Sequence, residues 1–327
     1  MASLVEPTFV LSLDKELIWG SFDHTSDVDF ARHNPDLRGV LTQLLSTLDE
    51  YNVPTTWAMV GHLFLDHCDR DVHGRSHPEI IRPAHSWYKY DWLDRDPCTD
   101  RARDPLWYGD DIIAAILAAK VKHEIGSHSF THMVYGDPGC SEQAAESDLR
   151  ACIAAAESKG IELRSFVFPR NVEGHHRLLA KYGFTSYRGE DPVWYRATPG
   201  AVKRGLHLVD QALAIEPPVS VPTETLPGLW NIPGSMLLLH RGGIRRVVSV
   251  DATIEKARKA LKRAVEKRAV FHLWFHPFNL SQHRGMMFAA LRGILSEVAA
   301  LHQRGMIECR TMGQIATELS ASSKGLR

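Results

Sequence analysis

The stretch HEIGSHSFTH, residues 123–132, carries the pattern that decides the fold. Its first half, residues 123–127, reads as a short strand, and His128 and His132 follow where that strand ends. Two imidazoles four residues apart can bind one divalent ion, because each offers a neutral nitrogen. Parallel α/β folds place their active sites at the carboxyl ends of strands. The stretch therefore predicts a strand that ends in a metal site.

Strands and helices alternate on both sides of this stretch. The predicted strands cover residues 8–13, 55–60, 123–127, 165–168, 184–187 and 270–275. The predicted helices cover residues 36–51, 110–120, 141–159, 174–182, 252–267 and 286–303, with a final strand and helix around Ile307 and Ile315. Short apolar runs between helical patterns are typical of buried parallel strands with helices outside. The alternation alone fits either a closed barrel or an open doubly wound sheet.

One long segment, residues 62–108, interrupts the alternation with many tryptophans, tyrosines, prolines and charged residues. Loops of this length inside compact enzymes usually act as lids or binding loops. A chain of 327 residues can bury one full core, and α/β barrels of this size commonly form one domain. We therefore expect one α/β domain over residues 1–327, with an inserted loop region at 62–108.

Composition excludes several classes of partner. With 38 basic and 39 acidic side chains, the chain has no bulk field to recruit nucleic acid or an anionic membrane. Its five cysteines form no CxxC pair and are odd in number, which favours a reducing compartment over a disulfide framework. Neither a signal-like start nor a long apolar run is present, so we expect a cytoplasmic protein without a membrane span. The oligomeric state is not specified.

Other polar residues also follow predicted strands. Asp14 and Glu16 come after the first, Arg170 and Asn171 after the strand at 165–168, and His276 after the last long one. We expect these side chains to share one rim with the histidine pair. Each has a structural alternative: a surface turn for the acids, loop capping for the histidine pair, an ion pair for Arg170, and a packed turn for His276. The alternatives together require several coincidences, so we favour a shared site.

At these residues the chain resembles the polysaccharide deacetylase (NodB-homology) superfamily, carbohydrate esterase family four. The matching segments, in the expected order, are residues 12–16, 128–132, 168–171, 230–233 and 273–277. The histidine segment is the most specific of these and the tryptophan segment at 230–233 is the weakest. The resemblance implies a distorted (β/α) barrel that removes an acetyl group from an N-acetylated sugar with the help of a zinc-like ion.

Two departures from the family pattern stand out. The usual adjacent pair of aspartates is replaced by Asp14-Lys15-Glu16. Alternate residues of a strand point the same way, so Asp14 and Glu16 can face one site while Lys15 faces away. We therefore predict that Glu16 takes the ligand position. Relatives often carry tyrosine and glycine where this chain has Arg170 and Asn171, so backbone donation can persist there with different side-chain contacts.

The resemblance also implies a role for each residue. Three residues would bind the divalent ion, for which zinc is the preferred identity: Glu16, His128 and His132. Three would act in the reaction, as proton acceptor, proton donor and charge partner of the acceptor: Asp14, His276 and Arg170. The backbone amide of Arg170 would also face the developing oxyanion. Four would contact the sugar, together with aromatic side chains of the 62–108 loop: Trp19, Trp107, Asn171 and Trp230. For the aromatic side chains, packing in the core is an equally supported alternative.

Two other functions stay open at this level. Some members of the superfamily act on small cyclic or linear amides, even without metal, and the lost Asp-Asp pair keeps that reading available. A catalytically inactive carbohydrate-binding protein of the same fold is the other. The missing export signal favours a nucleotide-linked or lipid-linked sugar precursor, or a small glycan, over a wall polymer as substrate.

Overall fold

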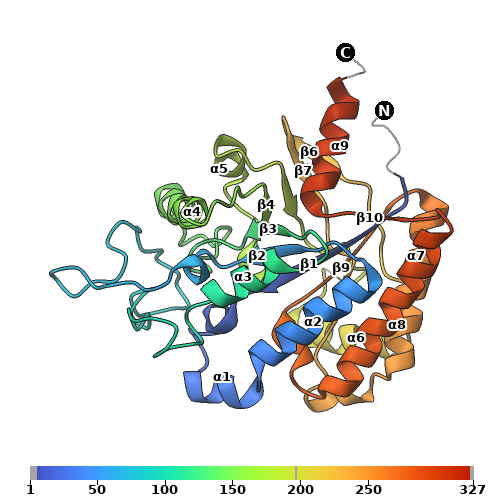
Figure 1. Ribbon diagram of the computed structural model, residues 1–327, viewed down its shortest axis with the longest axis horizontal. Helices are drawn as coiled ribbons and strands as arrows, with labels where there is room; N and C mark the ends of the chain where they lie inside the picture. Colours follow the sequence, from blue (N-terminus) through green and yellow to red (C-terminus); the bar gives the residue numbers. More distant parts are fainter. Residues whose placement is uncertain (1–5, 196, 325–327) are drawn as a thin grey trace.

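A ten-stranded sheet that curls into a half-barrel forms the centre of the computed structural model, which describes residues 6–195 and 197–324 (Figure 1). The strands are β1 Thr8–Lys15, β2 Thr56–Met59, β3 Glu124–Ser127, β4 Ser165–Val167, β5 Ser186–Arg188, β6 Thr223–Leu226, β7 Leu229–Asn231, β8 Met236–Leu237, β9 Val270–Phe275 and β10 Glu308–Cys309. Their order is β6-β7-β5-β4-β3-β2-β1-β9-β8, and β10 pairs with β1. Among these ladders β6–β7 is antiparallel and the others are parallel.

Helices cover the outside of this sheet. The α-helices are α1 Asp27–His33, α2 Leu37–Tyr51, α3 Asp110–Ala118, α4 Glu142–Glu157, α5 His176–Lys181, α6 Gly200–Ala212, α7 Val250–Lys267, α8 Arg284–Gln303 and α9 Met312–Lys324. Short 3-10 turns follow several strands: η1 Leu17–Gly20, η2 Gly61–Phe64, η3 Pro169–Asn171, η4 Gly243–Val247 and η5 Pro277–Leu280. The strand and helix alternation predicted from the sequence is confirmed, and β1 extends two residues further than expected.

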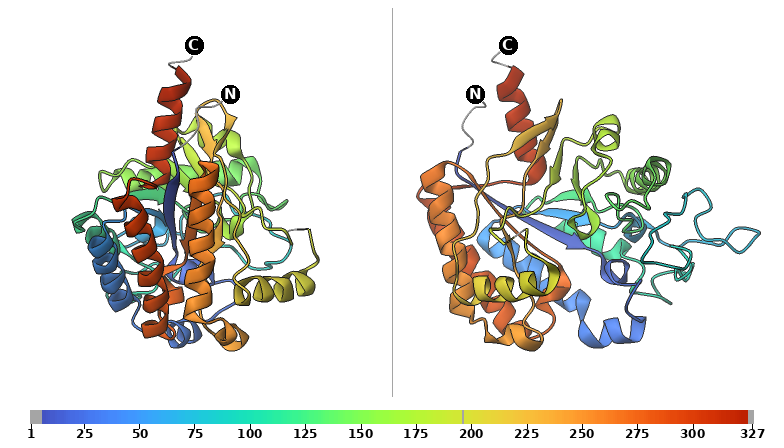
Figure 2. Two further views of the ribbon diagram at one scale, coloured as in Figure 1. Left: turned by 90° about the vertical axis from the view of Figure 1, so that its right-hand side faces the viewer. Right: turned by 180° about the vertical axis from the view of Figure 1, so that it is seen from behind.

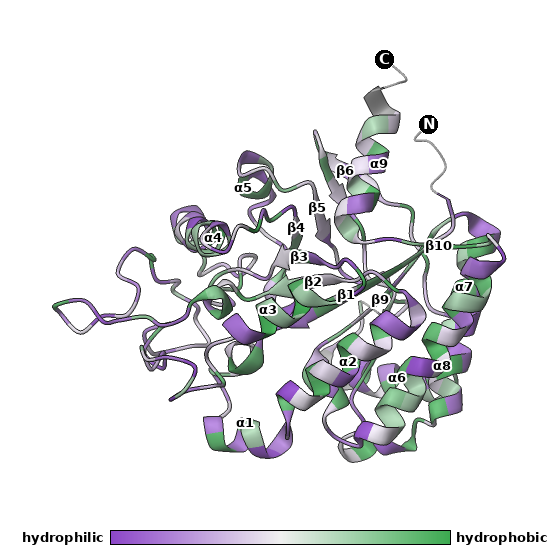
Figure 3. Cartoon of the chain, in the orientation of Figure 1, coloured by the Kyte–Doolittle hydropathy of each residue, from purple (hydrophilic) through white to green (hydrophobic). Residues whose placement is uncertain are grey.

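The two faces of β1 serve different purposes. Odd-numbered side chains, such as Leu11 and Leu13, join the main apolar core under the helices, whereas Val10 belongs to a second apolar cluster on the inner side. Ser12 and Asp14 also point inward, where both contact the same arginine side chain. Figure 3 shows hydrophobic colour along β1 and β9 in the middle of the molecule. The period-two alternation of a strand thus delivers polar atoms to the concave side.

Helix α9 covers the inner cluster at the end of the sheet where β1 begins, and both views of Figure 2 show it there. Its apolar side chains Met312, Ile315 and Leu319 belong to this cluster. The helix is tied to the strands because Met312 N–H donates to Thr56 Oγ1 and Gly313 N–H donates to the Glu124 carboxylate. The carboxyl ends of the strands, at the other end of the half-barrel, stay free for a site.

The predicted insertion is a long excursion between β2 and α3 (Figure 1). After η2, the described chain forms no helix or named strand until residue 110, apart from isolated bridges such as His67 with Asp100. Its aromatic side chains still pack: Trp92, Trp107 and Tyr108 are buried in the main core. Over the described residues, no helix combines the length and apolar character that a bilayer crossing requires.

Candidate active site

Five side chains that the sequence analysis predicts to be functional meet at the carboxyl ends of neighbouring strands. β1 positions Asp14 and is followed by Glu16, β3 is followed by His128 and His132, and β9 is followed by His276. These strands lie side by side in the order β3-β2-β1-β9, so their ends share one edge of the sheet. One oxygen of Glu16 lies within reach of all three imidazoles.

The Glu16 carboxylate and the two histidines form a compact group of donor atoms. Glu16 Oε1 lies 2.9 Å from His128 Nε2 and 3.1 Å from His132 Nε2, and the three ligand atoms all fall within 4.8 Å of one another. The side chains are 5%, 1% and 3% exposed, respectively, which shields an ion from bulk water.

The hydrogen bonds of His128 test whether these residues fit a metal ion. Its Nδ1–H donates to the Val167 carbonyl oxygen at 2.8 Å, so Nε2 of the neutral ring carries a lone pair toward Glu16. A lone pair facing a carboxylate oxygen at hydrogen-bond distance is repulsive unless a cation lies between them. A divalent ion bound by Glu16, His128 and His132 relieves this contact, and an oxygen with two nitrogens suits zinc. The donor set therefore fits the predicted metal.

A buried aspartate on α4 shapes the loop that carries the histidines. Asp148 accepts the backbone N–H groups of Phe130 and Thr131, the Thr131 hydroxyl at 2.6 Å and the Tyr135 hydroxyl at 2.9 Å. The loop needs such support because Ser129 and His132 adopt positive φ angles of 60° and 57°, a conformation that is costly for residues other than glycine. The four hydrogen bonds fix the direction in which both imidazoles point.

The structure corrects the expected charge partner of Asp14. Arg188, at the end of β5, donates two hydrogen bonds of 2.7 Å to the two Asp14 oxygens and one of 3.0 Å to Ser12 Oγ. Its guanidinium also lies 4.1 Å above the Trp274 ring. Arg170, which we expected in this role, instead pairs with Asp23 at 2.5 Å. β5 ends at the same edge as β1 and so brings its arginine inward, whereas η3 turns Arg170 toward Asp23.

His276 faces both carboxylates. Its Nε2 lies 3.3 Å from Glu16 Oε1 and 3.8 Å from Asp14 Oδ2. Its side chain is 24% exposed, whereas both carboxylates are at most 5% exposed, so among the residues of this group His276 is the one that solvent reaches. The Phe278 ring stacks on it with a centroid separation of 4.9 Å and fixes the plane of the imidazole.

The charges of the group separate the protonation states. Burial alone would raise the pKa of Asp14, but the Arg188 guanidinium keeps this pKa below its usual value. Burial would likewise raise the pKa of Glu16, and the neighbouring histidines, led by His276, hold it well below normal. Burial lowers the pKa of His132. Burial also lowers the pKa of His276, but the charges of Glu16 and Asp14 outweigh this effect and raise the pKa above its usual value. This arrangement favours the ionised form of both carboxylates, the neutral form of His132 and the protonated form of His276.

The residues expected to contact sugar occupy different places. Asn171 lies at the site, where its Oδ1 accepts a 3.1 Å hydrogen bond from Arg188. Trp19 is buried under the insertion and donates to the Trp107 carbonyl, and Trp107 is itself 2% exposed and donates to Asp27. Trp230 is 3% exposed and belongs to the inner apolar cluster beside α9. All three tryptophans are buried, so none of them presents a ring face to a ligand. This corrects our expectation that they contact the sugar.

The sequence analysis assigned no role to several residues that build the site: Ser12, Asp148, Arg188, His272 and Trp274. The Ser12 hydroxyl links Arg188 to His272 Nε2, at 3.0 and 2.8 Å. Arg188 directly follows a predicted strand, so the strand-end argument applied to the other residues could have found it. Asp148 gave no such signal, because a lone acid within a helical pattern reads as part of a solvated face.

A basic cavity of about 860 Å³ lies beside this edge. Among the residues lining it are Lys203, Arg204, His207, His240 and Arg245, and in the described part of the chain no aspartate or glutamate lines it. Burial and the charge of Arg245 lower the pKa of His240, and the charge of His276 lowers it further, which places the cavity near His276. A cavity of this charge is suited to an anionic group.

The curled parallel sheet gives the chain the distorted (β/α) barrel of the polysaccharide deacetylases, as the sequence analysis predicted. A structure from Mycobacterium smegmatis that is described as a polysaccharide deacetylase aligns with a TM-score of 0.62 at 20% identity. The alignment covers 97% of this chain and 91% of the other. A second structure with this description, from Pseudomonas aeruginosa PAO1, aligns with a TM-score of 0.59 at 12% identity. That alignment covers 95% of this chain and 89% of the other. No family model and no curated protein matches the sequence.

Proposed function

We propose that this chain is a metal-dependent hydrolase that removes an acetyl group from an N-acetylated sugar or glycan precursor by breaking the amide C–N bond. The observation that carries the proposal is the meeting of Glu16, His128 and His132 in one buried donor set, with Asp14 and His276 beside it. The shared fold with polysaccharide deacetylase structures supports the same reaction class.

Glu16, His128 and His132 hold the divalent ion in this proposal, and zinc is the preferred identity because the ligands are one carboxylate oxygen and two imidazole nitrogens. At such a donor set a divalent ion polarises a carbonyl and activates water near neutral pH. The placement of Glu16 supports the idea that the ligand carboxylate has moved by one position, from residue 15 to Glu16, rather than been lost.

Asp14 accepts the proton of the attacking water, and Arg188 keeps Asp14 ionised and fixes its orientation. The hydroxide portion of the water joins the acetyl carbon and the C–N bond breaks. Protonated His276 gives its proton to the departing amine, in accord with its raised pKa. The backbone amide of Arg170, on the turn after β4, is the proposed donor to the developing oxyanion. The products are acetate and a free amino sugar.

The basic cavity beside His276 favours a substrate with an anionic group, such as an N-acetylated nucleotide sugar or phospholipid-linked sugar. The Lys203, Arg204 and Arg245 side chains would bind its phosphates while the acetamido group lies at the buried carboxylates. Asn171 stays the proposed polar contact to the sugar. Trp87 replaces the buried tryptophans as the proposed aromatic contact. It is 41% exposed, but the Arg170 guanidinium and the His85 ring both stack on it, so the sugar would contact its exposed edge.

Acetate release tests the function. The purified chain would be assayed on N-acetylated nucleotide sugars, neutral chito-oligosaccharides and simple ureides, with and without chelator. We expect release that the chelator abolishes and that is faster on the anionic sugars. Glu16→Gln keeps the shape of the side chain and removes its charge, so activity falls by at least ~10²-fold, while Glu142→Gln on the outside of α4 serves as control.

The other outcomes identify the alternatives. Ureide hydrolysis that survives metal removal would establish the amidohydrolase on small amides and refute the deacetylase. Sugar binding without acetate release, unchanged in Asp14→Asn, would establish an inactive carbohydrate-binding protein.

Gly20 offers a sharper test of Glu16 as a ligand. A Cβ built on Gly20 would lie 1.8 Å from Glu16 Oε2, so Gly20→Ala must push the carboxylate away from the histidines. We expect a weaker affinity for the catalytic ion and a matching loss of activity, with little change in stability because the side chain can swing aside. Gly285→Ala, which also meets nothing within 4 Å, is the matched control. Unchanged metal affinity in Gly20→Ala would remove Glu16 from the ligand set.

A further inference from the structure

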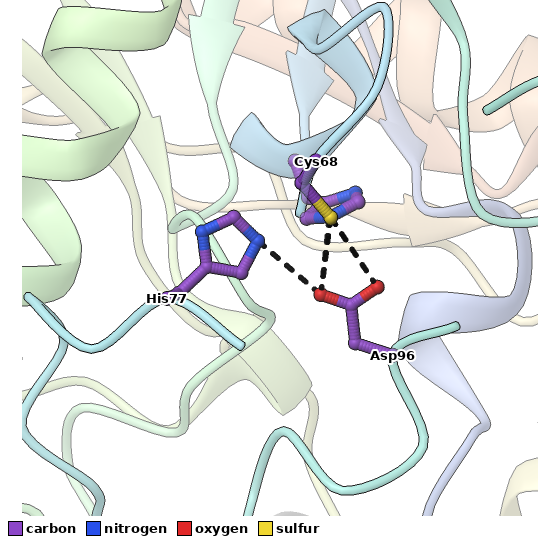
Figure 4. A group of neighbouring side chains, drawn as sticks. Cys68, His77 and Asp96 are labelled. Atoms are coloured by element: carbon purple, nitrogen blue, oxygen red, sulfur yellow. Dashed lines mark hydrogen bonds and ion pairs between the residues drawn. The ribbon is translucent and has the colours of Figure 1, made fainter. Parts of the chain in front are cut away.

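A second group of potential ligands lies inside the insertion, away from the catalytic residues. It consists of His62, Cys68, His77 and Asp96, hereafter the insertion cluster (Figure 4). Each residue offers one ligand atom, and the four atoms lie within 4.8 Å of one another. His62 and Asp96 have fully buried side chains, and that of His77 is 9% exposed. Figure 4 shows Cys68 and His77 directed toward the Asp96 carboxylate.

Four of the six separations within the insertion cluster match the edges of a zinc tetrahedron, and the other two lie within 4.8 Å. Bonds of ~2.0–2.3 Å to zinc place tetrahedral ligands about 3.3–3.6 Å apart. His62 Nε2 lies 3.4 Å from Asp96 Oδ2, and His77 Nε2 lies 3.2 Å from the same oxygen. Cys68 Sγ lies 3.6 Å from both His62 Nε2 and Asp96 Oδ2. The atoms are spaced as ligands of one ion rather than as a chain of hydrogen bonds.

The outer contacts of each side chain orient a lone pair into the cluster. His62 Nδ1–H donates to the Trp107 carbonyl, and His77 Nδ1–H donates to Glu79, both at 3.2 Å. In its neutral form, each ring therefore turns an unprotonated Nε2 inward. His77 Nε2 is buried without a hydrogen bond of acceptable geometry. A cation in the centre satisfies both nitrogens and the carboxylate together.

The sulfur has an outer partner of the kind that a thiolate requires. The Tyr108 hydroxyl lies 3.2 Å from Cys68 Sγ. The same hydroxyl accepts the Thr99 backbone N–H at 2.8 Å, which leaves its own proton free to point at the sulfur. A hydroxyl that donates to the sulfur stabilises the deprotonated form, which is the form that binds metal.

We propose that the insertion cluster is a structural zinc site with one cysteine, two histidines and one aspartate as ligands. The thiolate selects zinc over magnesium or calcium, and four protein ligands close the coordination sphere, as in structural rather than catalytic sites. The metal replaces the regular secondary structure that the insertion lacks. It also explains why this long polar loop can bury His62, His77 and Asp96.

The zinc site supports the catalytic loop from behind. Gly61 N–H donates to the Ser129 carbonyl and His62 N–H to the Phe130 carbonyl, at 2.8 and 3.0 Å. The Phe130 ring contacts the His62 and His77 rings, with centroid separations of 5.7 and 5.2 Å. Loss of zinc from the insertion should therefore loosen the segment that carries both catalytic histidines.

Cobalt substitution tests the proposal without relying on catalysis. The full chain would be stripped of metal, refilled with Co²⁺ and examined for the near-ultraviolet charge-transfer band of a cobalt thiolate. We expect this band in the wild type and in Glu16→Gln, because the catalytic donor set contains no sulfur. We expect its loss in Cys68→Ser and its retention in Cys309→Ser, a partly buried cysteine in β10.

X-ray absorption at the zinc edge covers the case in which Cys68→Ser does not fold. It would be measured on Glu16→Gln, which retains the insertion cluster, and should show one sulfur at ~2.3 Å with nitrogen and oxygen neighbours. A wild type without cobalt thiolate absorption would overturn the proposal and leave a buried His77–Asp96 ion pair. A band lost in Cys98→Ser but kept in Cys68→Ser would overturn the ligand assignment. None of these results depends on the proposed deacetylase activity.

Discussion

The Asp14 carboxylate depends on Arg188 for both its charge and its direction. Arg188 reaches both Asp14 oxygens from a side chain that is 1% exposed, and its guanidinium geometry matches a carboxylate in a way that an ammonium does not. We class it as a positioning residue, because it acts on the reaction through Asp14.

Arg188→Met should destabilise the fold by about 3–5 kcal/mol, because it leaves a buried carboxylate without its partner. Arg188→Lys keeps the charge but loses the paired hydrogen bonds, so kcat should fall more than KM changes, and the pKa of Asp14 should rise in the pH profile of kcat. Urea unfolding and steady-state kinetics measure both effects. Arg170→Lys, at the half-buried Asp23 pair, is the control, and an equal loss there would return the role to Arg170.

Lys15 predicts a pH dependence that does not involve the site. It lies on the opposite face of β1 from Asp14, where burial lowers its pKa from 10.5 to about 7. Between these values the unfolded chain holds a proton that the folded chain has released, so stability rises with pH from about 7 to 10.5. The slope is up to about 1.4 kcal/mol per pH unit.

Lys15→Met should therefore stabilise the protein at pH 7, by about 1–4 kcal/mol. It should also flatten the rise above that pH, as followed by urea unfolding at several pH values. Lys120→Met at an exposed position should do neither. A slope that persists in Lys15→Met would assign the pH dependence to another group.

Single residues differed in how far the sequence could predict them. Asp14, Glu16, His128, His132 and His276 were predicted because a polar residue directly after an apolar strand is an unusual signal, and the structure places all five together. The insertion cluster had no comparable signal. Its members are separated by 6, 9 and 19 positions and follow no strand or helix pattern, so each read as an isolated residue. Only the fold of the insertion brings them together.

At the level of elements, α4 and the histidine loop form one unit through Asp148. Asp148→Asn replaces one of the two acceptor oxygens with an NH2 group, which cannot accept a hydrogen bond from the loop. Since each unsatisfied buried group costs about 1–3 kcal/mol, we expect a loss of about 2–5 kcal/mol in urea unfolding. Weaker binding of the catalytic metal should accompany it. Glu142→Gln at the start of the same helix should change neither, and normal metal affinity in Asp148→Asn would mean that the loop holds its shape alone.

Elements with strong periodicity were predicted, and those shaped by context were not. The strands β1 to β5 and the helices α2 to α5 and α7 to α9 appear where apolar spacing placed them, whereas the helices α1 and α6 were not predicted. The β6–β7 hairpin was missed because a proline-rich stretch reads as a loop, although Gly228, with φ of 78°, makes the tight turn possible. β8 is two residues long and is defined only by its pairing with β9, which no local pattern reveals.

At the level of the whole molecule, Trp230 joins the sheet to the C-terminal helix. Its Nε1 donates to Ser320 at 3.0 Å, and its ring fills the cluster between β7 and α9. Trp230→Ala should lower stability by about 3–5 kcal/mol, and Trp230→Phe by about 1 kcal/mol for the lost hydrogen bond. Both should leave KM unchanged at temperatures where the variants are folded. A raised KM in Trp230→Phe would restore the sugar-binding role that the sequence suggested.

The choice between a closed barrel and an open doubly wound sheet could not be made from alternation alone, because both have the same local pattern. The half-barrel arises because β9 and β8 continue the sheet beyond β1. In the pairing of β1 with β9, partners such as Leu13 and Phe275 are more than 200 residues apart in the sequence. Pairings of that range are set by the packing of α2, α7 and α8 outside the sheet rather than by any short segment.

The unequal exposure of the catalytic group has a consequence for selectivity. In the proposed reaction, an amide that enters past His276 would direct its acyl carbon inward, toward carboxylates that are at most 5% exposed, while its nitrogen remains at the open side. We therefore expect the inner end to favour a methyl group over a longer acyl tail, and the outer end to accept amines of widely different size. In the proposed reaction the protein would read the length of the group it removes far more strictly than the size of the molecule that carries it.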